Sequence, residues 1–198
     1  NDIEGDVTAT QAADVKLTVD GNGHEFAGVI TVDGKSATYT TAGLTVKNVN
    51  FVAESISADA CVRLGDGNNA TRYTCNVTLE NCTFDVPGAV GVKSYTGGDK
   101  NLTIKNCTAT DKAHSLVQAK GVDGVLIENC TVNSKNGMNF NNSDNVTVNQ
   151  CTTDVKGYAV RFGESSGGSG AAEKYAINNS TLKSACEDGD AVIILRGT

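Results

Sequence analysis

Five polar side chains occupy one repeated position between apolar neighbours in short segments of the chain: Arg63, Lys93, Gln118, Asn139 and Arg161. Arg and Lys pair with carboxylates or sulfates, whereas Gln and Asn hydrogen-bond hydroxyl groups. A row of such side chains is suited to an anionic or hydroxyl-rich ligand, for example a glycan. The alternative interpretation is that outward strand positions are simply polar and that the long stems cover a sheet.

Carboxylates form a second candidate set. Asp85, Asp111 and Asp154 recur at almost the same place, in predicted turns just before this row, and Glu54 lies at a similar place. Two carboxyls about 5 to 9.5 Å apart that face one sugar would support glycoside hydrolysis. Asp also caps turns. We favour the turn interpretation, because the coil that follows Asp111 carries Ser134 in this place.

A repeat must position these side chains. The pattern apolar, any, apolar, any, Asn, Cys, Thr, apolar recurs with substitutions at intervals of 21 to 33 residues. Its copies are Leu44–Phe51, Val77–Phe84, Leu102–Ala109, Val125–Val132, Val146–Thr153 and Tyr175–Leu182, with a looser copy at Leu17–His24. Alternation indicates a strand, and Asn marks a bend because it tolerates the left-handed backbone region. We expect Gly21 to take this bend position in the first copy for the same reason.

A third strand is expected after each copy, which makes three strands per repeat. The expected third strands are Val29–Val32, Cys61–Leu64, Val90–Ser94, Leu116–Ala119, Met138–Phe140, Ala159–Phe162 and Ala191–Leu195. Such a unit buries its apolar face only when coils stack about 4.8 Å apart. The sequence therefore predicts an all-β parallel solenoid of about seven coils.

These features resemble the right-handed parallel β-helix of the pectate-lyase-like superfamily, whose coils commonly carry an asparagine ladder at a tight bend. The matching residues are Asn48, Asn81, Asn106, Asn129 and Asn179, with Gln150 in one coil, and the opening segment Val19–Phe26. The resemblance covers nearly the whole chain. It implies that any chemistry lies on the outer face of the third strand, and the chain looks like a non-catalytic, bacterial surface or adhesin-like member.

The resemblance also implies what an enzyme would need. A lyase of this family would use Ca²⁺, held by clustered acids beside an Arg or Lys base, but the acids here are dispersed. Family hydrolase signatures such as Asn-Thr-Asp and Gly-His-Gly are absent from the sequence. His24 and His114 have no evident Ser, Cys or carboxylate partner by spacing. We expect no metal and no cofactor, with Ca²⁺ only if the chain is a lyase.

Four of the seven cysteines share one inward position of the repeat, which Val49 and Ser180 take in other coils: Cys82, Cys107, Cys130 and Cys151. Small buried packing explains this row, and members one coil apart cannot surround one metal ion tetrahedrally. The Asn-Cys-Thr triplets also match the N-glycosylation pattern, but we favour the ladder, since a stacked Asn leaves little room for a glycan. A Cys61–Cys75 disulfide and the state of Cys186 remain open.

Composition limits the classes of partner. The 198 residues fit a single domain, residues 1–198, and the net charge of −7 disfavours nucleic acid. No apolar run approaches the roughly 18 residues that would span a bilayer. Acidity, many small polar residues and the family resemblance favour an extracellular or cell-surface location. The chain begins without a leader, so any signal peptide has been removed or cropped.

The last expected strand is followed by only three residues, Arg196–Thr198, which leaves no room for a capping helix. Because open solenoid ends are normally covered, we expect a fragment of a larger protein with further domains, or an end covered by another chain.

Two hypotheses on function follow. The first is a non-catalytic extracellular or cell-surface domain that binds an acidic or hydroxyl-rich glycan or acts as an adhesin. The second is a polysaccharide lyase or glycoside hydrolase acting on an acidic polysaccharide. Short turns between the expected strands favour the first, because they offer little wall for a catalytic cleft.

Overall fold

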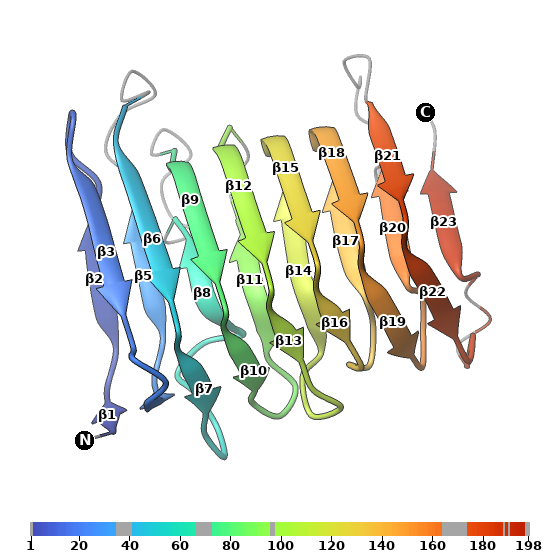
Figure 1. Ribbon diagram of the computed structural model, residues 1–198, viewed down its shortest axis with the longest axis horizontal. Helices are drawn as coiled ribbons and strands as arrows, with labels where there is room; N and C mark the ends of the chain where they lie inside the picture. The colour runs from blue at the N-terminus through green and yellow to red at the C-terminus, as the bar shows by residue number, and fades with distance from the viewer. Residues whose placement is uncertain are drawn as a thin grey trace.

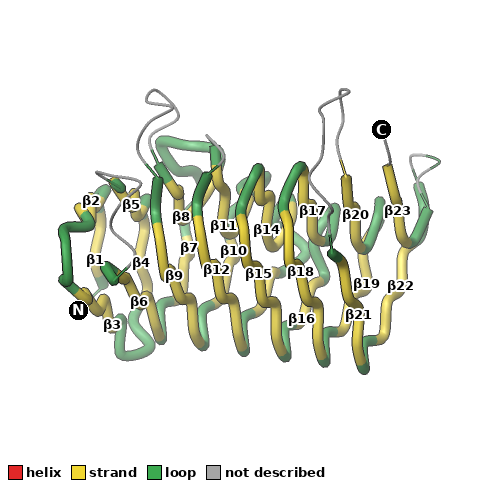
Figure 2. The backbone as a smooth tube through the Cα atoms, turned by 90° about the horizontal axis from the view of Figure 1, so that it is seen from above, coloured by secondary structure: helices red, strands yellow, loops and turns green. Residues whose placement is uncertain are grey.

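The computed structural model describes residues 2–34, 41–65, 73–95, 98–163, 174–187, 189 and 191–196. In these segments the chain forms 23 β-strands and no helix, and the strands wind into a solenoid of three parallel sheets (Figure 1). Coils follow one another along the long axis, so β1 and β23 lie at opposite ends (Figure 2). The predicted all-β parallel solenoid is confirmed.

Each sheet collects the equivalent strand of every repeat. Sheet I consists of β3 (Lys16–Asp20), β6 (Gly43–Lys47), β9 (Cys75–Glu80), β12 (Lys100–Lys105), β15 (Asp123–Glu128), β18 (Asp144–Asn149) and β21 (Tyr175–Asn178). Sheet II consists of β1 (Ile3–Glu4), β4 (Glu25–Ala27), β7 (Asn50–Val52), β10 (Thr83–Asp85), β13 (Thr108–Ala109), β16 (Thr131–Val132), β19 (Thr152–Val155) and β22 (Thr181–Ser184). Sheet III consists of β2 (Val7–Thr10), β5 (Ile30–Asp33), β8 (Ala60–Leu64), β11 (Val90–Ser94), β14 (Ser115–Lys120), β17 (Met138–Asn141), β20 (Val160–Gly163) and β23 (Ile193–Arg196).

The strands follow the sequence pattern closely. Each of the six main copies of the motif lies on a strand of sheet I and continues, after the bend, into sheet II. The strands of sheet III begin and end within two residues of the expected third strands. Alternation places one set of side chains inside, as in β9, where buried and partly buried residues alternate. The register between coils is therefore set by which residues are apolar.

The core lies inside the coils and is built of like side chains stacked from one coil to the next. Phe51 and Phe84 stack with ring centroids 5.3 Å apart, and Phe140 and Phe162 stack at 5.5 Å. All four are at most 2 % exposed. Such stacking fills the interior of these coils, and each coil depends on its neighbours because it has no core of its own.

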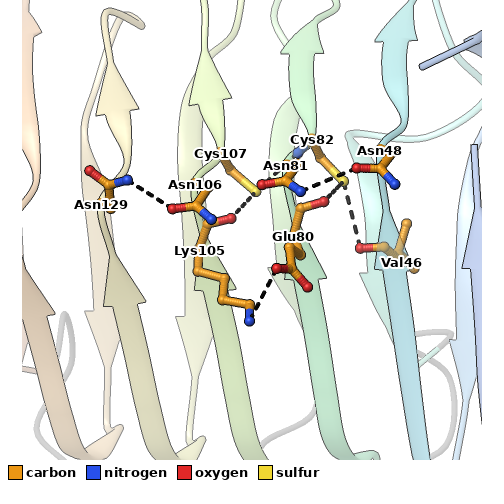
Figure 3. A network of polar contacts seen from close by, with 9 residues as sticks. All are labelled: Val46, Asn48, Glu80, Asn81, Cys82, Lys105, Asn106, Cys107 and Asn129. Carbon is orange, nitrogen blue, oxygen red and sulfur yellow. Dashed lines mark hydrogen bonds and ion pairs between the residues drawn. The ribbon is translucent and has the colours of Figure 1, made fainter. Parts of the chain in front are cut away.

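The bend between sheets I and II carries the predicted polar ladder. Its residues all have φ between 49° and 54°: Asn48, Asn81, Asn106, Asn129, Gln150 and Asn179. Amide groups bond along the row, with Asn81 Nδ2 donating to Asn48 Oδ1 at 3.2 Å and Asn129 Nδ2 to Asn106 Oδ1 at 2.8 Å (Figure 3). The predicted ladder is therefore confirmed, although the side chains of Asn81, Asn106 and Asn129 are exposed.

Gly21 differs from the expectation for the first copy. Its φ is not in the left-handed region, and the neighbouring Asn22 adopts a φ of 49° instead. A Cβ on Gly21 would lie 2.6 Å from the carbonyl oxygen of Asn48 in the next coil. Glycine is therefore needed here for close approach of two backbones, not for a left-handed conformation.

The cysteine row is buried directly behind this ladder. Cys82, Cys107, Cys130 and Cys151 are each 1 % exposed, and Figure 3 shows Cys82 and Cys107 beside the asparagine row. All seven cysteines are free thiols, so the structure has no Cys61–Cys75 disulfide. Burial raises the pKa of Cys61 to about 12, which keeps this thiol protonated and unreactive at neutral pH.

The two ends of the coil stack leave apolar side chains exposed. At the first end Ile3 is 54 % exposed, and at the last end Leu195 is 72 % exposed, although Leu195 pairs with the buried Phe162 of the preceding coil. Within the described segments, no helix is long and apolar enough to cross a membrane.

Candidate ligand-binding face

The five residues of the candidate row lie side by side on the outer face of sheet III. Pairing between neighbouring strands joins them in the order Arg63, Lys93, Gln118, Asn139 and Arg161. All five are partly exposed. At about 4.8 Å per strand, the row is roughly 19 Å long. The sequence-based prediction of one aligned outward row is thus confirmed, while its role in binding remains a prediction.

Lys93, at the second place in this row, is held by a carboxylate. Lys93 Nζ lies 2.5 Å from Asp59 Oδ2, and the Tyr95 hydroxyl donates a hydrogen bond to the other Asp59 oxygen. Burial raises the pKa of the Asp59 carboxyl, but the hydrogen bonds and charge of its partners outweigh burial, so the net effect lowers it. Lys93 is therefore a fixed, partly neutralised cation, which the sequence did not predict.

Two tyrosines pack against the cations of the row. The Tyr95 ring lies 4.7 Å from the Arg63 guanidinium carbon and 4.9 Å from Lys93 Nζ, and Arg161 lies 4.2 Å from the Tyr158 ring. These are cation–π distances, and they restrict the long side chains. Burial, with the hydrogen bond to Asp59, raises the pKa of Tyr95 to about 12. The phenol therefore stays protonated at neutral pH and donates to Asp59.

A hollow of about 240 Å³ opens beside the middle of the row. Most of its polar lining comes from two neighbouring outward positions on β14, on β17 and at the end of β11: Lys93, Tyr95, Gln118, Lys120, Asn139 and Asn141. Three of these residues, Tyr95, Lys120 and Asn141, were missed by the sequence analysis. Each lies two residues after a member of the row, so strand alternation alone could have identified them as a parallel second row.

Two buried oxygens face no donor in this region. Asn139 Oδ1 and Asn141 Oδ1 are shielded from solvent, and among the described residues neither accepts a hydrogen bond. Buried polar atoms are almost always hydrogen-bonded in folded proteins, so exceptions call for an explanation.

The acidic candidates do not meet at one place. Asp85 and Asp154 lie in strands β10 and β19 of sheet II, not in turns as expected, and only Asp111 is in a turn. Asp85 accepts a hydrogen bond from Lys112 Nζ at 2.6 Å, and this bond together with one from Thr110 lowers its pKa. Asp111 and Asp154 are exposed. The expectation of turns failed for Asp85 and Asp154 because β10 and β19 continue through these residues, so the turns begin after them.

Neither histidine nor metal-binding geometry adds a reactive centre to this face. His114 Nε2 lies 3.4 Å from Asn136 Nδ2, and burial, with the nearby Lys135 and Lys93, lowers its pKa. His24 lies at the first end of the stack, 3.9 Å from Asp2. Within the described segments, no three His, Cys, Asp or Glu residues are grouped so that they could hold a metal ion.

Comparisons with known proteins address the fold. No curated protein matches the sequence. The solved structures to which this chain is similar include Aspergillus niger pectin methylesterase in deglycosylated form. The TM-score is 0.29 and the sequence identity is 12 %, and the alignment covers 98 % of this chain and 82 % of that chain. The same enzyme carrying an N-acetylglucosamine stub also has a TM-score of 0.29 and 12 % identity, with coverage of 100 % and 83 %. At such TM-scores the similarity carries no argument about activity. The family model described as right-handed β-helix region matches residues 27–195, and the chain therefore belongs to this family.

Proposed function

We propose that the outer face of sheet III binds an acidic or hydroxyl-rich glycan, as part of a non-catalytic extracellular or cell-surface β-helix domain. The observation that supports this best is the aligned row with arginines at both ends and amides in its centre. Arg63 and Arg161 would pair with carboxylate or sulfate groups, and Gln118 and Asn139 with hydroxyl groups.

The charge distribution favours a glycan over a nucleic acid. The chain has a net charge of −7, so the surface as a whole repels a long polyanion while the row attracts anionic groups locally. Each exposed ion pair contributes only about 0.2 to 1 kcal/mol. Affinity must therefore come from several contacts along the row and should fall as salt is added.

The alternative function, a polysaccharide lyase or glycoside hydrolase, gains no support from the positions of Asp85, Asp111 and Asp154. Asp85 is engaged with Lys112, and Asp111 and Asp154 are exposed on different coils. A direct assay on acidic polysaccharides, with and without Ca²⁺, tests this alternative. Release of unsaturated uronate or reducing sugar by the chain would contradict the non-catalytic assignment.

The binding proposal is tested by removing the cations of the row. The triple variant Arg63→Ala, Lys93→Ala and Arg161→Ala should lose at least tenfold in affinity for acidic oligosaccharides on a glycan array, since about three weak pairs are removed. A matched variant removes three lysines elsewhere, Lys47→Ala, Lys105→Ala and Lys183→Ala, and changes the net charge equally.

Two outcomes would contradict the proposal: equal loss in both triple variants, or no binding of any acidic glycan by the parent. Because Arg63 and Arg161 pack on tyrosines, a second variant with Gln at the three positions keeps most of the stems while removing the charges. Circular dichroism checks that each variant retains its strand content.

A further inference from the structure

A second hollow lies on the outer face of sheet I, away from the row of sheet III. Its volume is about 610 Å³, which falls within the range of about 300 to 1,000 Å³ typical of ligand pockets. It spans β3, β6 and the start of β9, which lie side by side in Figure 1. Its polar and small lining residues are Lys16, Thr18, Thr41, Gly43, Thr45 and Asn76.

The hollow exists because Gly43, the first residue of β6, has no side chain. Lys16 pairs with Gly43 in the preceding coil, and Asn76 takes the same place in the next coil. Gly43 has no left-handed φ, and a Cβ built on it would have the Asn76 carbonyl oxygen, at 3.3 Å, as its nearest atom. Alanine would therefore fit after a small shift, and glycine leaves space that the fold itself does not require to be empty.

Three polar groups of the lining can be reached from solvent. Lys16 and Thr18 are exposed, and Thr45 is partly exposed. Within the described segments, the side chains of these residues form no hydrogen bond or ion pair. Thr18 and Thr45 are paired neighbours, so their side chains leave the sheet roughly 4.8 Å apart. A ligand in the hollow can therefore contact one ammonium group and two hydroxyl groups.

The other polar groups of the lining already have partners. The Thr41 hydroxyl donates a hydrogen bond to Asp14. Asn76 Nδ2 donates to the Ala42 carbonyl oxygen at 2.8 Å, and Asn76 Oδ1 accepts from Asn101 Nδ2 at 2.9 Å. These groups hold the walls in place, so recognition of a ligand falls to the ammonium group and the two hydroxyl groups.

The charges around the hollow favour a ligand with a single negative charge. Lys16 is the cation of the lining. Asp14 and Asp20 stand near its edges, and of these two only Asp20 pairs with a described cation, Lys47, at 3.0 Å. The carboxylates repel a dianion such as phosphate, whereas one carboxylate group on a ligand matches one ammonium group.

We infer that the sheet I hollow binds a sugar acid, whose carboxylate pairs with Lys16 and whose hydroxyl groups hydrogen-bond Thr18 and Thr45. Leu17, which is 36 % exposed at the hollow, and the threonine methyl groups offer apolar surface to the C–H groups of the sugar ring. The hollow lies on a different sheet from the row of Arg63 and Arg161. This inference therefore does not rest on the proposed function.

Titrations followed by nuclear magnetic resonance of the threonine methyl groups test the inference. The probes are glucuronate and galacturonate, compared with glucose, galactose and inorganic phosphate. Lys16→Gln with Thr45→Val removes the charge and one hydroxyl group and keeps the approximate shape of both side chains. Lys156→Gln with Thr103→Val is the matched control, because Lys156 is exposed beyond β19 and Thr103 lies in the same outward row as Thr45, two coils further on.

We expect glucuronate or galacturonate to shift the Thr18 and Thr45 methyl signals of the parent, and the neutral sugars to shift them less. The Lys16 and Thr45 double variant should bind the sugar acid about tenfold more weakly, the order expected for losing one exposed ion pair and one hydrogen bond. The control should stay within about twofold of the parent. No shift with either sugar acid, an equal response to galactose or phosphate, or unchanged binding by the double variant would overturn the inference.

Filling the hollow provides a second test. Gly43→Val adds two methyl groups above β6, and valine is favoured in strands. This variant should lose the shift of Thr18 with the sugar acids while its circular dichroism keeps the strand signal. A folded Gly43→Val variant that binds as well as the parent would contradict the inference.

The two binding faces can be told apart by their variants. The triple alanine variant of the sheet III row should keep the sugar-acid shifts at Thr18 and Thr45. If the proposed function is wrong and the sheet I hollow is right, acidic oligosaccharides act on these two threonines alone. If the sheet I hollow is wrong and the proposed function is right, oligosaccharide binding persists in the Lys16 and Thr45 double variant and is lost in the triple variant.

Discussion

Asp99 is a buried carboxyl that forms no ion pair with the described residues, in contrast to Asp59, which pairs with Lys93. It is 1 % exposed and accepts hydrogen bonds from Thr74 N at 2.7 Å, Thr74 Oγ1 at 2.9 Å and Ser94 Oγ at 2.7 Å. Burial raises its pKa despite these bonds. The side chain joins consecutive coils just before β9 and β12, so its protonation state affects the stability of the coil stack.

The raised pKa of Asp99 predicts a pH dependence of stability. A carboxyl whose pKa is higher in the folded state than in the unfolded state stabilises the fold when it is protonated. Its contribution to the free energy of unfolding is complete below the pKa of the unfolded state, about 3.9, and is lost as pH rises through the pKa of the folded state. Asp99→Asn should remove this loss and flatten the pH dependence above pH 4, measured by urea unfolding. Asp99→Ala should cost about 1 to 3 kcal/mol, because the Thr74 N–H loses its partner. Identical pH profiles of parent and Asp99→Asn would contradict the assignment.

At the scale of elements, the bends decide where each strand begins. Besides the predicted ladder, a second left-handed position precedes the apolar residues of sheet I, with φ between 50° and 81°: Asn76, Asn101, Gly124 and Asn145. Asn101 Nδ2 donates to Asn76 Oδ1 at 2.9 Å. In several coils, Asn or Gly therefore stands near both ends of the sheet I strand. This repeated spacing of Asn and Gly could have identified the second row from the sequence.

Two variants at the ladder residue Asn106 distinguish the effect of backbone strain from that of the side-chain hydrogen bond. Asn106→Ala places alanine, which lacks a side-chain amide, in the left-handed region. This change should lower the free energy of unfolding by about 1 to 2 kcal/mol. Asn106→Gly also removes the hydrogen bond that Asn129 Nδ2 donates to Asn106 Oδ1, but it relieves the strain, so it should lower the stability less. Urea denaturation of the two variants measures the difference. A glycine variant less stable than the alanine variant would show that the amide ladder, not φ, dominates.

For the whole molecule, stability should decrease from the middle of the coil stack to its ends. Central strands such as β12 pair on both sides, whereas β3 and β23 each pair on one side only among the strands that the structure describes. In solenoids, stability is approximately a sum over coils and the interfaces between neighbours. Exposed Leu195 and Ile3 show that the end coils bury their apolar side chains incompletely.

Hydrogen exchange tests this gradient. Backbone amides of β9, β12 and β15 should exchange slowest, and those of β1, β3 and β23 fastest, because edge strands open without disrupting the centre. Phe84→Ala, in the stacked core, should destabilise by about 3 to 5 kcal/mol. Leu195→Ala, at an exposed site, should change stability by less than about 0.5 kcal/mol. Uniform exchange across all coils would indicate one cooperative unit instead.

The sequence alone determined the coil, because the properties that build it are local. Alternation of apolar and polar residues decides which side chains point inward, and Asn in the left-handed region decides where the chain bends. Together they set the register, so the row from Arg63 to Arg161 could be identified in advance. The inward cysteine position followed from the same pattern.

Only the tertiary structure decided what the outward side chains contact. The Lys93–Asp59 pair joins residues 34 positions apart, and it depends on the path of a turn that carries no repeat signal. Asp85 and Asp154 were misplaced because the length of each sheet II strand varies from coil to coil. Burial of the Asn139 and Asn141 oxygens depends on neighbouring coils, since a side chain's surroundings are set by the strands stacked beside it. Periodicity therefore predicts the direction of a side chain, and the packing of successive coils decides its partners and charge.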